Sequence, residues 1–382
     1  PGTAAVFRAD IAPDIGGTEL REAARDPKRG VRSRVIMDSL FHRIPKALIK
    51  HLLDEGVEIR EHNPFRWTHP FKSLERMHDK LIIRDGVSGV MGGRNISRAY
   101  FNMSNKNYDD RDVLVEGPEV LNVEKYFDDL WKSDMVKAPN LSRVKTKNAD
   151  EAGKLLDEAL ATLKKFGWLD QPPTQLTPAD ENCGKMECVT NVIRGNIRDL
   201  SIVRKRLFQL ANESTGVVLI ETPYLIPSEE TLLAFENARE RRVRVIVVTS
   251  SVQYNDGILP AGGYLYYRRR LAQTGIELYE YQGPNALHAK SAVFDRKIGT
   301  VASFNLDPRS ARLNSELLVI THDPKKAAEL EASIMKHVAN SKLVAKDGVM
   351  IKGLRDFKGL PIRKILKIAC ARALTPLIKG QL

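Results

Sequence analysis

The sequence lacks several features that would assign it to a special class of protein. No apolar run approaches the roughly 18–20 residues needed to span a bilayer, so no membrane-spanning helix is predicted. Cysteine is scarce, and Cys183, Cys188 and Cys370 show no Cys/His spacing typical of a zinc site. Cys183 and Cys188 either close a small disulfide loop or are free thiols, which leaves the redox compartment open. There is no signal-peptide pattern, and the chain begins at Pro1 rather than Met, so we expect further residues upstream.

The composition is ordinary for a soluble globular protein. The chain has 382 residues, of which 42% are hydrophobic and 28% are charged. This length is sufficient for two domains with an ample core.

Positive charge is concentrated towards the C-terminus. The formal net charge is +12, and the residues from Ser341 onward hold ten Lys and Arg against Asp347 and Asp356, which gives this tail a charge of +8. A patch this basic predicts an anionic partner, either a membrane surface or a nucleic acid. A solvated tail without a partner is the alternative.

Within the tail, residues 361–379 (PIRKILKIACARALTPLIK) mix Ile and Leu with basic residues and predict an amphipathic helix. Pro376 is expected to break or kink its end. The predicted membrane-binding residues of this helix are Arg363, Lys364, Lys367 and Arg372.

Two stretches of the chain repeat one pattern of chemically reactive residues. From His78 to Asn95 the sequence reads HDKLIIRDGVSGVMGGRN, and from His288 to Asn305 it reads HAKSAVFDRKIGTVASFN. His, Lys, Asp and Asn stand at the same offsets in both copies, and one Gly of the first copy is replaced by Ala302. A single His-x-Lys match carries little weight, whereas two copies in register form a specific motif.

The surrounding segments repeat as well and predict an α/β fold. RVIM at 34–37 corresponds to RVIV at 244–247, and GVEIREH at 56–62 corresponds to GIELYEY at 275–281. Helices are predicted over 44–55, 149–166 and 229–241, whereas Gly262-Gly263-Tyr264 is interpreted as a loop. Short β-branched runs predict strands at Ala4–Phe7, Val35–Met37, Val57–Arg60, Leu81–Ile83, Val217–Glu221, Val243–Thr249, Ala292–Phe294 and Leu317–Ile320. Strands that alternate with helices favour largely parallel sheets covered on both faces.

The paired motif resembles the signature of the phospholipase D superfamily, HxKx4D followed by a G(G/S)xN turn, and the resemblance covers roughly residues 15–335. It implies two similar α/β/α sandwich domains with mixed, largely parallel sheets, related by a pseudo-two-fold axis, and an active site at their interface. The expected divisions are a first domain over 1–148, a helical and Pro-rich linker over 149–215, a second domain over 216–340 and the basic amphipathic tail over 341–382.

The repeated residue types suit a reaction at a phosphodiester. Its non-bridging oxygens accept hydrogen bonds, and Lys and Asn side chains donate them. Each fixed donor aimed at an oxyanion stabilises the transition state by about 3–4 kcal/mol. The predicted clamp consists of Lys80, Asn95, Lys290 and Asn305, and neither a metal ion nor another cofactor is expected. The two motif histidines would divide nucleophilic attack and proton transfer between them.

The resemblance also implies individual roles. His78 is expected to be the nucleophile and His288 the acid, although two nearly symmetrical motifs do not fix this order. An acidic residue should orient each His from its own half of the chain, which assigns Asp112 to His78 and Glu316 to His288. Asp110 is the alternative in the first half. Asp85 and Asp295 are expected to serve structure, in a buried salt bridge or a turn. Surface or core positions are expected for the other histidines: His42, His51, His62, His69, His322 and His337.

Three further segments resemble bacterial phospholipase D and cardiolipin-synthase-like members of the superfamily: RDVLVEGP at 111–118, ETPYLIP at 221–227 and SFNLDPRSARLNSELLVI at 303–320. The implied reaction cleaves the head group of a glycerophospholipid through a covalent phosphohistidine, by hydrolysis to phosphatidic acid or by transfer to an alcohol. The alternatives are a cardiolipin synthase with phosphatidylglycerol as acceptor, a metal-independent endonuclease, and a non-catalytic binding protein.

The implied partners are a phospholipid substrate, an anionic membrane surface and an alcohol or water acceptor; nucleic acid is not expected. Two motifs in one chain predict a monomer. The expected location is a membrane periphery, periplasmic or secreted if an upstream signal was removed and otherwise the cytoplasmic face. The aromatic segment FRWTHPF at 65–71 would contact a membrane or an acyl chain, with ordinary packing as the alternative.

Overall fold

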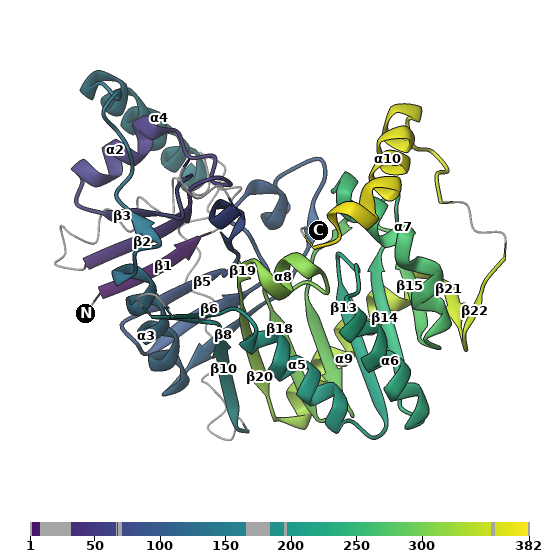
Figure 1. The fold of residues 1–382 in the computed structure, drawn as a ribbon. Coiled ribbons are helices and arrows are strands. Elements are labelled where there is room, and N and C mark those ends of the chain that lie inside the picture. Colours follow the sequence, from purple (N-terminus) through teal and green to yellow (C-terminus); the bar gives the residue numbers. More distant parts are fainter. Residues whose placement is uncertain are drawn as a thin grey trace.

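The structure is a computed structural model that describes residues 2–7, 32–65, 67, 71–165, 184–194, 197–352 and 356–380. Its two halves lie side by side, each built around a sheet with helices on both faces (Figure 1). The mixed α/β architecture predicted from the sequence is therefore confirmed. Cys183, His69 and the Pro-rich segment 172–178 lie outside the described residues.

The first sheet has the strand order β8-β6-β5-β1-β2-β3-β9. Strands β1, β2 and β3 run parallel, and their neighbours on both sides are antiparallel. The strands are β1 (Gly2–Phe7), β2 (Arg32–Asp38), β3 (Glu58–His62), β5 (Leu81–Arg84), β6 (Ser88–Gly92), β8 (Asp112–Glu116) and β9 (Val136–Lys137).

The second sheet has the order β10-β20-β18-β17-β13-β14-β15-β21-β22, with β13, β14 and β15 parallel. Its central part repeats the first sheet strand for strand. The strands are β10 (Met186–Thr190), β13 (Val217–Thr222), β14 (Arg244–Ser250), β15 (Glu277–Tyr281), β17 (Ser291–Phe294), β18 (Ile298–Ala302), β20 (Leu317–Thr321), β21 (Ser341–Lys346) and β22 (Val349–Met350). A hairpin of β11 (Val192–Arg194) and β12 (Ile197–Asp199) follows β10. Every strand predicted from β-branched runs is present.

Alternate residues of the strands enter cores on opposite faces, because strand side chains have a period of two. In β2, Val35 and Met37 pack with helices α2 (Lys46–Asp54) and α4 (Thr146–Lys165), whereas Ile36 packs with α3 (Glu119–Lys132). In the second half, one face carries α5 (Ile202–Glu213), α6 (Glu229–Glu240) and α7 (Ile258–Gln273), and the other carries α9 (Pro324–Ala339).

The segment predicted as a linker is divided between the halves. Helix α4 lies against α2 of the first half (Figure 1). Strand β10 extends the second sheet beside β20, yet the backbone N–H of Cys188 donates to Glu119 of α3 at 3.1 Å. The described part of residues 149–215 therefore joins the two cores.

The predicted tail boundary at residue 341 is wrong. Residues Ser341–Lys346 form β21, which pairs with β15 because its apolar residues Val344 and Ala345 belong to the core of the second half. The last helix, α10 (Ile362–Ile378), lies outside the sheet and crosses α7 at the upper end of this half (Figure 1). It continues to Ile378, so Pro376 stands within its last turn and does not end it earlier.

Gly262-Gly263-Tyr264 is not a loop but part of α7. A Cβ on Gly262 would lie 2.5 Å from the Cβ of Ala371 and 2.7 Å from the backbone nitrogen of Arg372 in α10. Glycine lets the two helix backbones approach at this crossing, which an ordinary helix-forming residue would prevent.

We expect Gly262→Val to displace α10 from α7. The added atoms meet α10 backbone, which yields less readily than a flexible side chain, and overpacking of this kind costs about 1–3 kcal/mol. Denaturant unfolding should show this loss, and hydrogen exchange should show faster exchange of the α10 amides. Gly380→Ala is the control, since a Cβ there meets no atom within 4 Å. Unchanged α10 protection would contradict the role assigned to Gly262.

Candidate active site

Each motif histidine is held by the opposite half of the chain. The two residues before His78 form β4 (Arg76–Met77), which pairs with β19 (Asn314–Ser315) of the second half. The two residues before His288 form β16 (Ala286–Leu287), which pairs with β7 (Tyr108–Asp109) of the first half. The backbone N–H of His78 donates to Ser315 O at 3.1 Å, and that of His288 donates to Asp109 O at 2.8 Å. Both motifs therefore lie at the interface, as predicted, and the reciprocal strand exchange is consistent with a pseudo-two-fold relation.

The carboxylates that orient the two imidazoles also come from the opposite half. His78 Nδ1 lies 2.9 Å from both carboxylate oxygens of Glu316. His288 Nδ1 lies 2.6 Å from Asp110 Oδ2. Both carboxylates are fully shielded from solvent. A carboxylate at Nδ1 fixes the ring and keeps a proton on that nitrogen, which leaves Nε2 for chemistry.

The predicted assignment of Asp112 to His78 is therefore wrong, as is the pairing of each His within its own half. Asp112 accepts from Arg94 Nε at 2.7 Å instead. The sheet register gives the reason: Gly92 pairs with Asp112, and the equivalent Ala302 pairs with Leu318. Two residues earlier on each strand, Asp110 corresponds to Glu316. The spacing from the motif turn does not give this equivalence, because Asp110 lies 15 residues after Asn95 and Glu316 lies 11 residues after Asn305.

The difference between the two motif turns follows from these carboxylates. Ser303 donates its hydroxyl to Glu316 Oε2, and its own backbone N–H donates to Leu317 O. At the equivalent place in the first half, a Cβ on Gly93 would lie 2.4 Å from Asp110 Oδ1. The shorter aspartate thus approaches so closely that only glycine fits, whereas the second half has room for serine.

The predicted donors of both motifs are buried beside the histidines. The ammonium of Lys80 donates to the backbone carbonyl of His78 at 2.5 Å, and that of Lys290 lies 2.8 Å from His288 Nδ1. Asn95 Nδ2 contacts the hydroxyl of Tyr100 at 2.8 Å. Within the described part of the chain, Asn95 Oδ1 and Asn305 Oδ1 are buried and have no hydrogen-bond partner.

A second orientation of the Asn95 amide agrees with the predicted donor role. A rotation by 180° would let its oxygen accept from Tyr100 and would put its NH2 group where the unpartnered oxygen now lies. In that orientation the NH2 could donate to a bound anion. The unpartnered position of Asn95 therefore fits the predicted donor role.

The remaining motif residues serve the turns. Asp85 and Asp295 have positive φ angles of 53° and 50° at the hairpins that follow β5 and β17. Asp295 also accepts from the backbone N–H groups of Thr215, Gly216 and Val217 at 2.8–2.9 Å. The turn role predicted from the sequence agrees with this geometry.

An aromatic wall that the sequence analysis missed surrounds His288. The rings of Tyr100, Tyr108 and Tyr224 lie 5.1, 5.5 and 6.4 Å from the imidazole, measured between centroids. Tyr100 belongs to the short helix η3 (Arg98–Phe101). Asp256 accepts from the hydroxyls of Tyr108 at 3.0 Å and Tyr224 at 2.7 Å. These residues come from four separate segments of the chain, and the sequence analysis named Tyr224 only as part of the ETPYLIP segment.

A charged network holds Asp110 in place. Next to it in sequence, Arg111 pairs with the buried Glu221 and donates to Ser291 Oγ at 2.7 Å and to Ser333 Oγ at 2.9 Å. His337 donates to Glu221 from the other side. Burial favours the neutral form of Glu221, but Arg111 and His337 outweigh it and hold the pKa of this carboxyl below its usual value. The network fixes the start of β8 against the second half.

The charges around His288 favour its neutral form. Burial and then the ammonium of Lys290 lower the pKa of the imidazole, and Asp110 opposes them. Burial alone would raise the pKa of Asp110, but Lys290 and His288 outweigh it and keep the pKa of this carboxyl low. Both shifts favour an ionised Asp110 beside a neutral imidazole.

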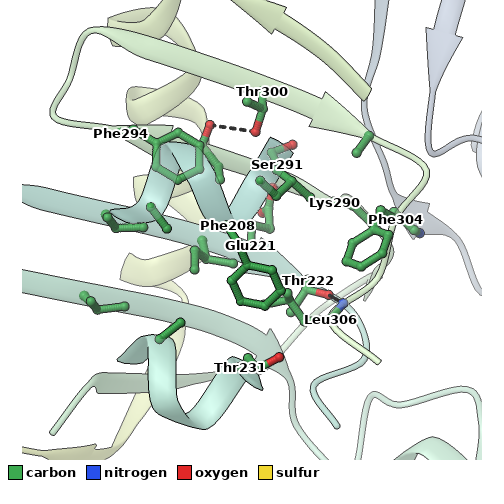
Figure 2. A pocket seen from close by; sticks show the side chains of 18 of the residues that line it. Phe208, Glu221, Thr222, Thr231, Lys290, Ser291, Phe294, Thr300, Phe304 and Leu306 are labelled. Atoms are coloured by element: carbon green, nitrogen blue, oxygen red, sulfur yellow. Dashed lines mark hydrogen bonds between the residues drawn. The ribbon is translucent and has the colours of Figure 1, made fainter. Parts of the chain in front are cut away.

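An apolar cavity of about 70 Å³ lies behind Lys290, between the second sheet and helices α5 and α6. Figure 2 shows Phe208 and Phe294 along it, with Lys290 and Phe304 towards one end. Ligand sites usually measure about 300–1,000 Å³, so this space is too small for an acyl chain. It is an imperfection in the core of the second half rather than a substrate site.

These features define a class of protein: a two-motif α/β chain whose halves exchange strands and carboxylates to build one composite site. The sequence family described as "Cardiolipin synthase, PLD-like domain" matches residues 18–131 and 207–338, which is more than half of the chain. The chain belongs to the phospholipase D superfamily.

Several curated proteins and solved structures are similar to it. Cardiolipin synthase C of Escherichia coli (strain K12) is 27% identical over 354 residues, which cover 82% of this chain and 74% of that protein. Cardiolipin synthase A of Pseudomonas syringae pv. syringae is 28% identical over 329 residues, which cover 85% of this chain and 61% of that protein. The crystal structure of phosphatidylserine synthase from Haemophilus influenzae Rd KW20 aligns with a TM-score of 0.67 at 16% identity, over 100% of this chain and 90% of that one. This last likeness shows a shared fold.

The crossed pairing predicts which carboxylates matter. We expect Asp110→Asn and Glu316→Gln each to lower turnover about 10–100-fold, because loss of the carboxylate leaves the imidazole in the wrong tautomer or orientation. Asp112→Asn is the matched control and should cost much less, since it changes only a contact with Arg94. Turnover would be measured on variants with wild-type circular dichroism. A larger loss in Asp112→Asn than in Asp110→Asn would contradict the assignment.

The charges around His288 predict its titration. Imidazole NMR should give His288 a pKa below the ordinary value of about 6.5. Removal of the Lys290 charge by Lys290→Met should raise this pKa, because one positive neighbour of the imidazolium is lost. A pKa that falls or stays constant in Lys290→Met would show that Lys290 does not act on the ring.

Proposed function

We propose that this chain is a phosphatidyltransferase, which cleaves a glycerophospholipid head group through a phosphohistidine and passes the phosphatidyl group to an alcohol or to water. The observation that carries the proposal is the pair of buried histidines, each with a carboxylate from the opposite half at Nδ1. Two such imidazoles supply both a nucleophile and an acid–base group. Membership of the superfamily supports this reading.

In the first step, His78 Nε2 attacks phosphorus and forms a P–N bond while the bond from phosphorus to the leaving alcohol oxygen breaks. His288 gives the proton that this oxygen takes up. The order follows the resemblance of the first motif to nucleophile motifs of the superfamily. In the free protein the pKa of His288 is low, but a bound phosphodiester adds negative charge beside the ring and favours the imidazolium that the acid role requires.

In the second step, neutral His288 takes the proton from the incoming alcohol or water. The new oxygen attacks phosphorus, the P–N bond breaks and His78 is restored. One positioned group thus acts first as acid and then as base, and each role typically contributes 10²–10⁴-fold.

The buried donors stabilise the charge that develops on the phosphoryl oxygens. Lys80 and Lys290 supply ammonium groups, and Asn95 and Asn305 supply amides with unpartnered positions. In a site shielded from water such fixed donors act strongly and need no reorganisation during the reaction. These donors bind the phosphoryl group itself, which is present in both steps of the reaction.

The choice of acceptor is the finer part of the proposal. Two relatives are named cardiolipin synthases, and a protein of the same fold is a phosphatidylserine synthase. These names support transfer to an alcohol rather than hydrolysis alone, with phosphatidylglycerol as acceptor in the cardiolipin case. Hydrolysis to phosphatidic acid is the outcome when water takes the acceptor place.

The test is incubation of the chain with phosphatidylglycerol and phosphatidylcholine vesicles and a primary alcohol, with EDTA present, followed by mass spectrometry of the lipids. Phosphatidyl-alcohol or cardiolipin is the expected product. Phosphatidic acid alone would limit the activity to hydrolysis. Untouched lipid together with cleavage of single-stranded DNA would overturn the proposal in favour of a nuclease.

The roles of the two histidines can be distinguished by trapping the covalent intermediate. With a phosphodiester that has a nitrophenol leaving group, which departs without an acid, His288→Ala should accumulate a phosphoryl adduct on His78, because nothing activates the acceptor. Intact-mass spectrometry and peptide mapping would locate it. His78→Ala should form no adduct and should lose about 10³-fold or more of turnover. An adduct on His288 in His78→Ala would reverse the two roles.

A further inference from the structure

We propose that the edge of the molecule around the active site docks on an anionic bilayer through two apolar patches, one from each half. The first patch, here the loop patch, consists of Leu40, Phe65 and Trp67. The second, the helix patch, is the outer face of α10. This inference rests on the proposed function, because a surface that seats a membrane at this edge serves a lipid substrate.

The helix patch is a continuous apolar stripe on the side of α10 that faces away from α7. Ile368, Ala371 and Thr375 form the buried side of this helix. Opposite to them, residues at helical spacing are all exposed and apolar: Ile362, Leu366, Ala369, Cys370, Ala373 and Leu377. Ile362 is 67% exposed and Leu377 is 82% exposed. A helix that is packed on one side and apolar on the other has room for a second partner.

Basic residues border the stripe on both sides, and all three are exposed: Arg363 and Lys367 on one side and Arg372 on the other. Acidic residues are absent from α10, whose sequence is IRKILKIACARALTPLI. An apolar face bordered by Lys and Arg is typical of helices that lie in the surface of an anionic membrane. Within the described residues no helix is both long and apolar enough to cross a bilayer. The charge also selects anionic lipid over a neutral surface.

Of the four basic residues predicted to bind membrane, Lys364 has a different place. Its ammonium donates to Asn255 O at 3.1 Å. The next residue is Asp256, which accepts from two tyrosines of the wall around His288. Lys364 therefore ties the first turn of α10 to the rim of the site.

The loop patch lies at the same edge of the first half. Arg76, two residues before His78, donates to Asp38 Oδ1 at 3.2 Å and to Asn63 O at 2.7 Å. Asp38 ends β2 and lies two residues before Leu40. Asn63 directly follows β3 and lies two residues before Phe65. These bonds place the patch beside the strand that leads to His78.

The residues of the loop patch are unusual for a surface. Leu40 is 64% exposed, Phe65 is 56% exposed and Trp67 is 88% exposed. Phe65 and Trp67 contact one another edge to face at a centroid distance of 5.0 Å. Tryptophan is rarely exposed to this extent, and its amphipathic ring favours the boundary between water and lipid. The aromatic contact keeps both rings together on the outside of the fold.

The test compares binding with catalysis in folded variants. Ile362, Leu366 and Leu377 would be replaced by Ser together, and Phe65 and Trp67 by Ser together. Binding to vesicles of equal phosphatidylglycerol and phosphatidylcholine, measured by co-sedimentation, should weaken at least tenfold in each variant, with a parallel loss of turnover on vesicles. Turnover of a short-chain phospholipid below its micellar concentration should stay within about twofold of wild type, because the site itself is intact.

The matched control replaces three comparably exposed leucines elsewhere by Ser: Leu121, Leu155 and Leu233. It should bind vesicles as the wild type does. Unchanged binding in both test variants, or an equal loss in the control, would overturn the proposal. If the chain binds vesicles through these patches but turns over no lipid, the proposed function fails and this inference stands.

A second measurement uses the wild-type chain, with Trp67→Phe to assign the signal. Phosphatidylglycerol vesicles with brominated acyl chains should quench the part of the fluorescence that Trp67→Phe removes. Lack of quenching at saturating vesicles would exclude insertion of the loop patch. Binding to pure phosphatidylcholine that equals binding to phosphatidylglycerol would exclude the role of the basic borders.

Discussion

The interaction on which this structure depends is the exchange of carboxylates between its halves. Glu316 and Asp110 are shielded from solvent, and each bonds a histidine that belongs to the other motif. A buried carboxylate is costly unless it is paired, so the burial of each acid at the interface depends on the histidine of the other half. The strand pairs β4–β19 and β7–β16 fix the same segments through their backbones. The active site therefore exists only in the assembled pair, and the closure of the interface and the orientation of the imidazoles are one event.

The parts of this arrangement that sequence reasoning found are those determined locally. Strands such as β14 follow from β-branched runs, and the reactive residues follow from two motifs in register. Asp110 was ranked behind Asp112 because the choice depends on which residue pairs with Gly92 across the sheet, and register is a property of two strands rather than of one. The exchange between halves is likewise a matter of topology. Tyr108 and Asp256 lie 148 residues apart in the chain, and no local pattern joins them.

The C-terminal segment illustrates the same limit in another way. Its composition revealed the basic and apolar residues of α10, but composition does not show which side of the helix the fold covers. Gly262 decides this, because only a residue without Cβ lets α10 approach α7. Once Ala371 occupies that contact, helical spacing turns Leu366 and Leu377 outward together. Gly262 thus sets which face α10 presents to the outside.

The small cavity behind Lys290 bears on how such a site would meet a lipid. At about 70 Å³ this cavity cannot hold the acyl chain of a phospholipid. Chemistry at the phosphodiester does not require one, because the reacting group sits at the boundary between the acyl chains and water. An enzyme that leaves the acyl chains in the bilayer avoids the free-energy cost of extracting them. This cost increases with every CH2 group that is transferred to water. In such an enzyme the surface around the site, rather than a cavity, has to bring the histidines to the level of the head groups. In the docking that we propose, apolar side chains beside the site and positive charge around them meet that requirement.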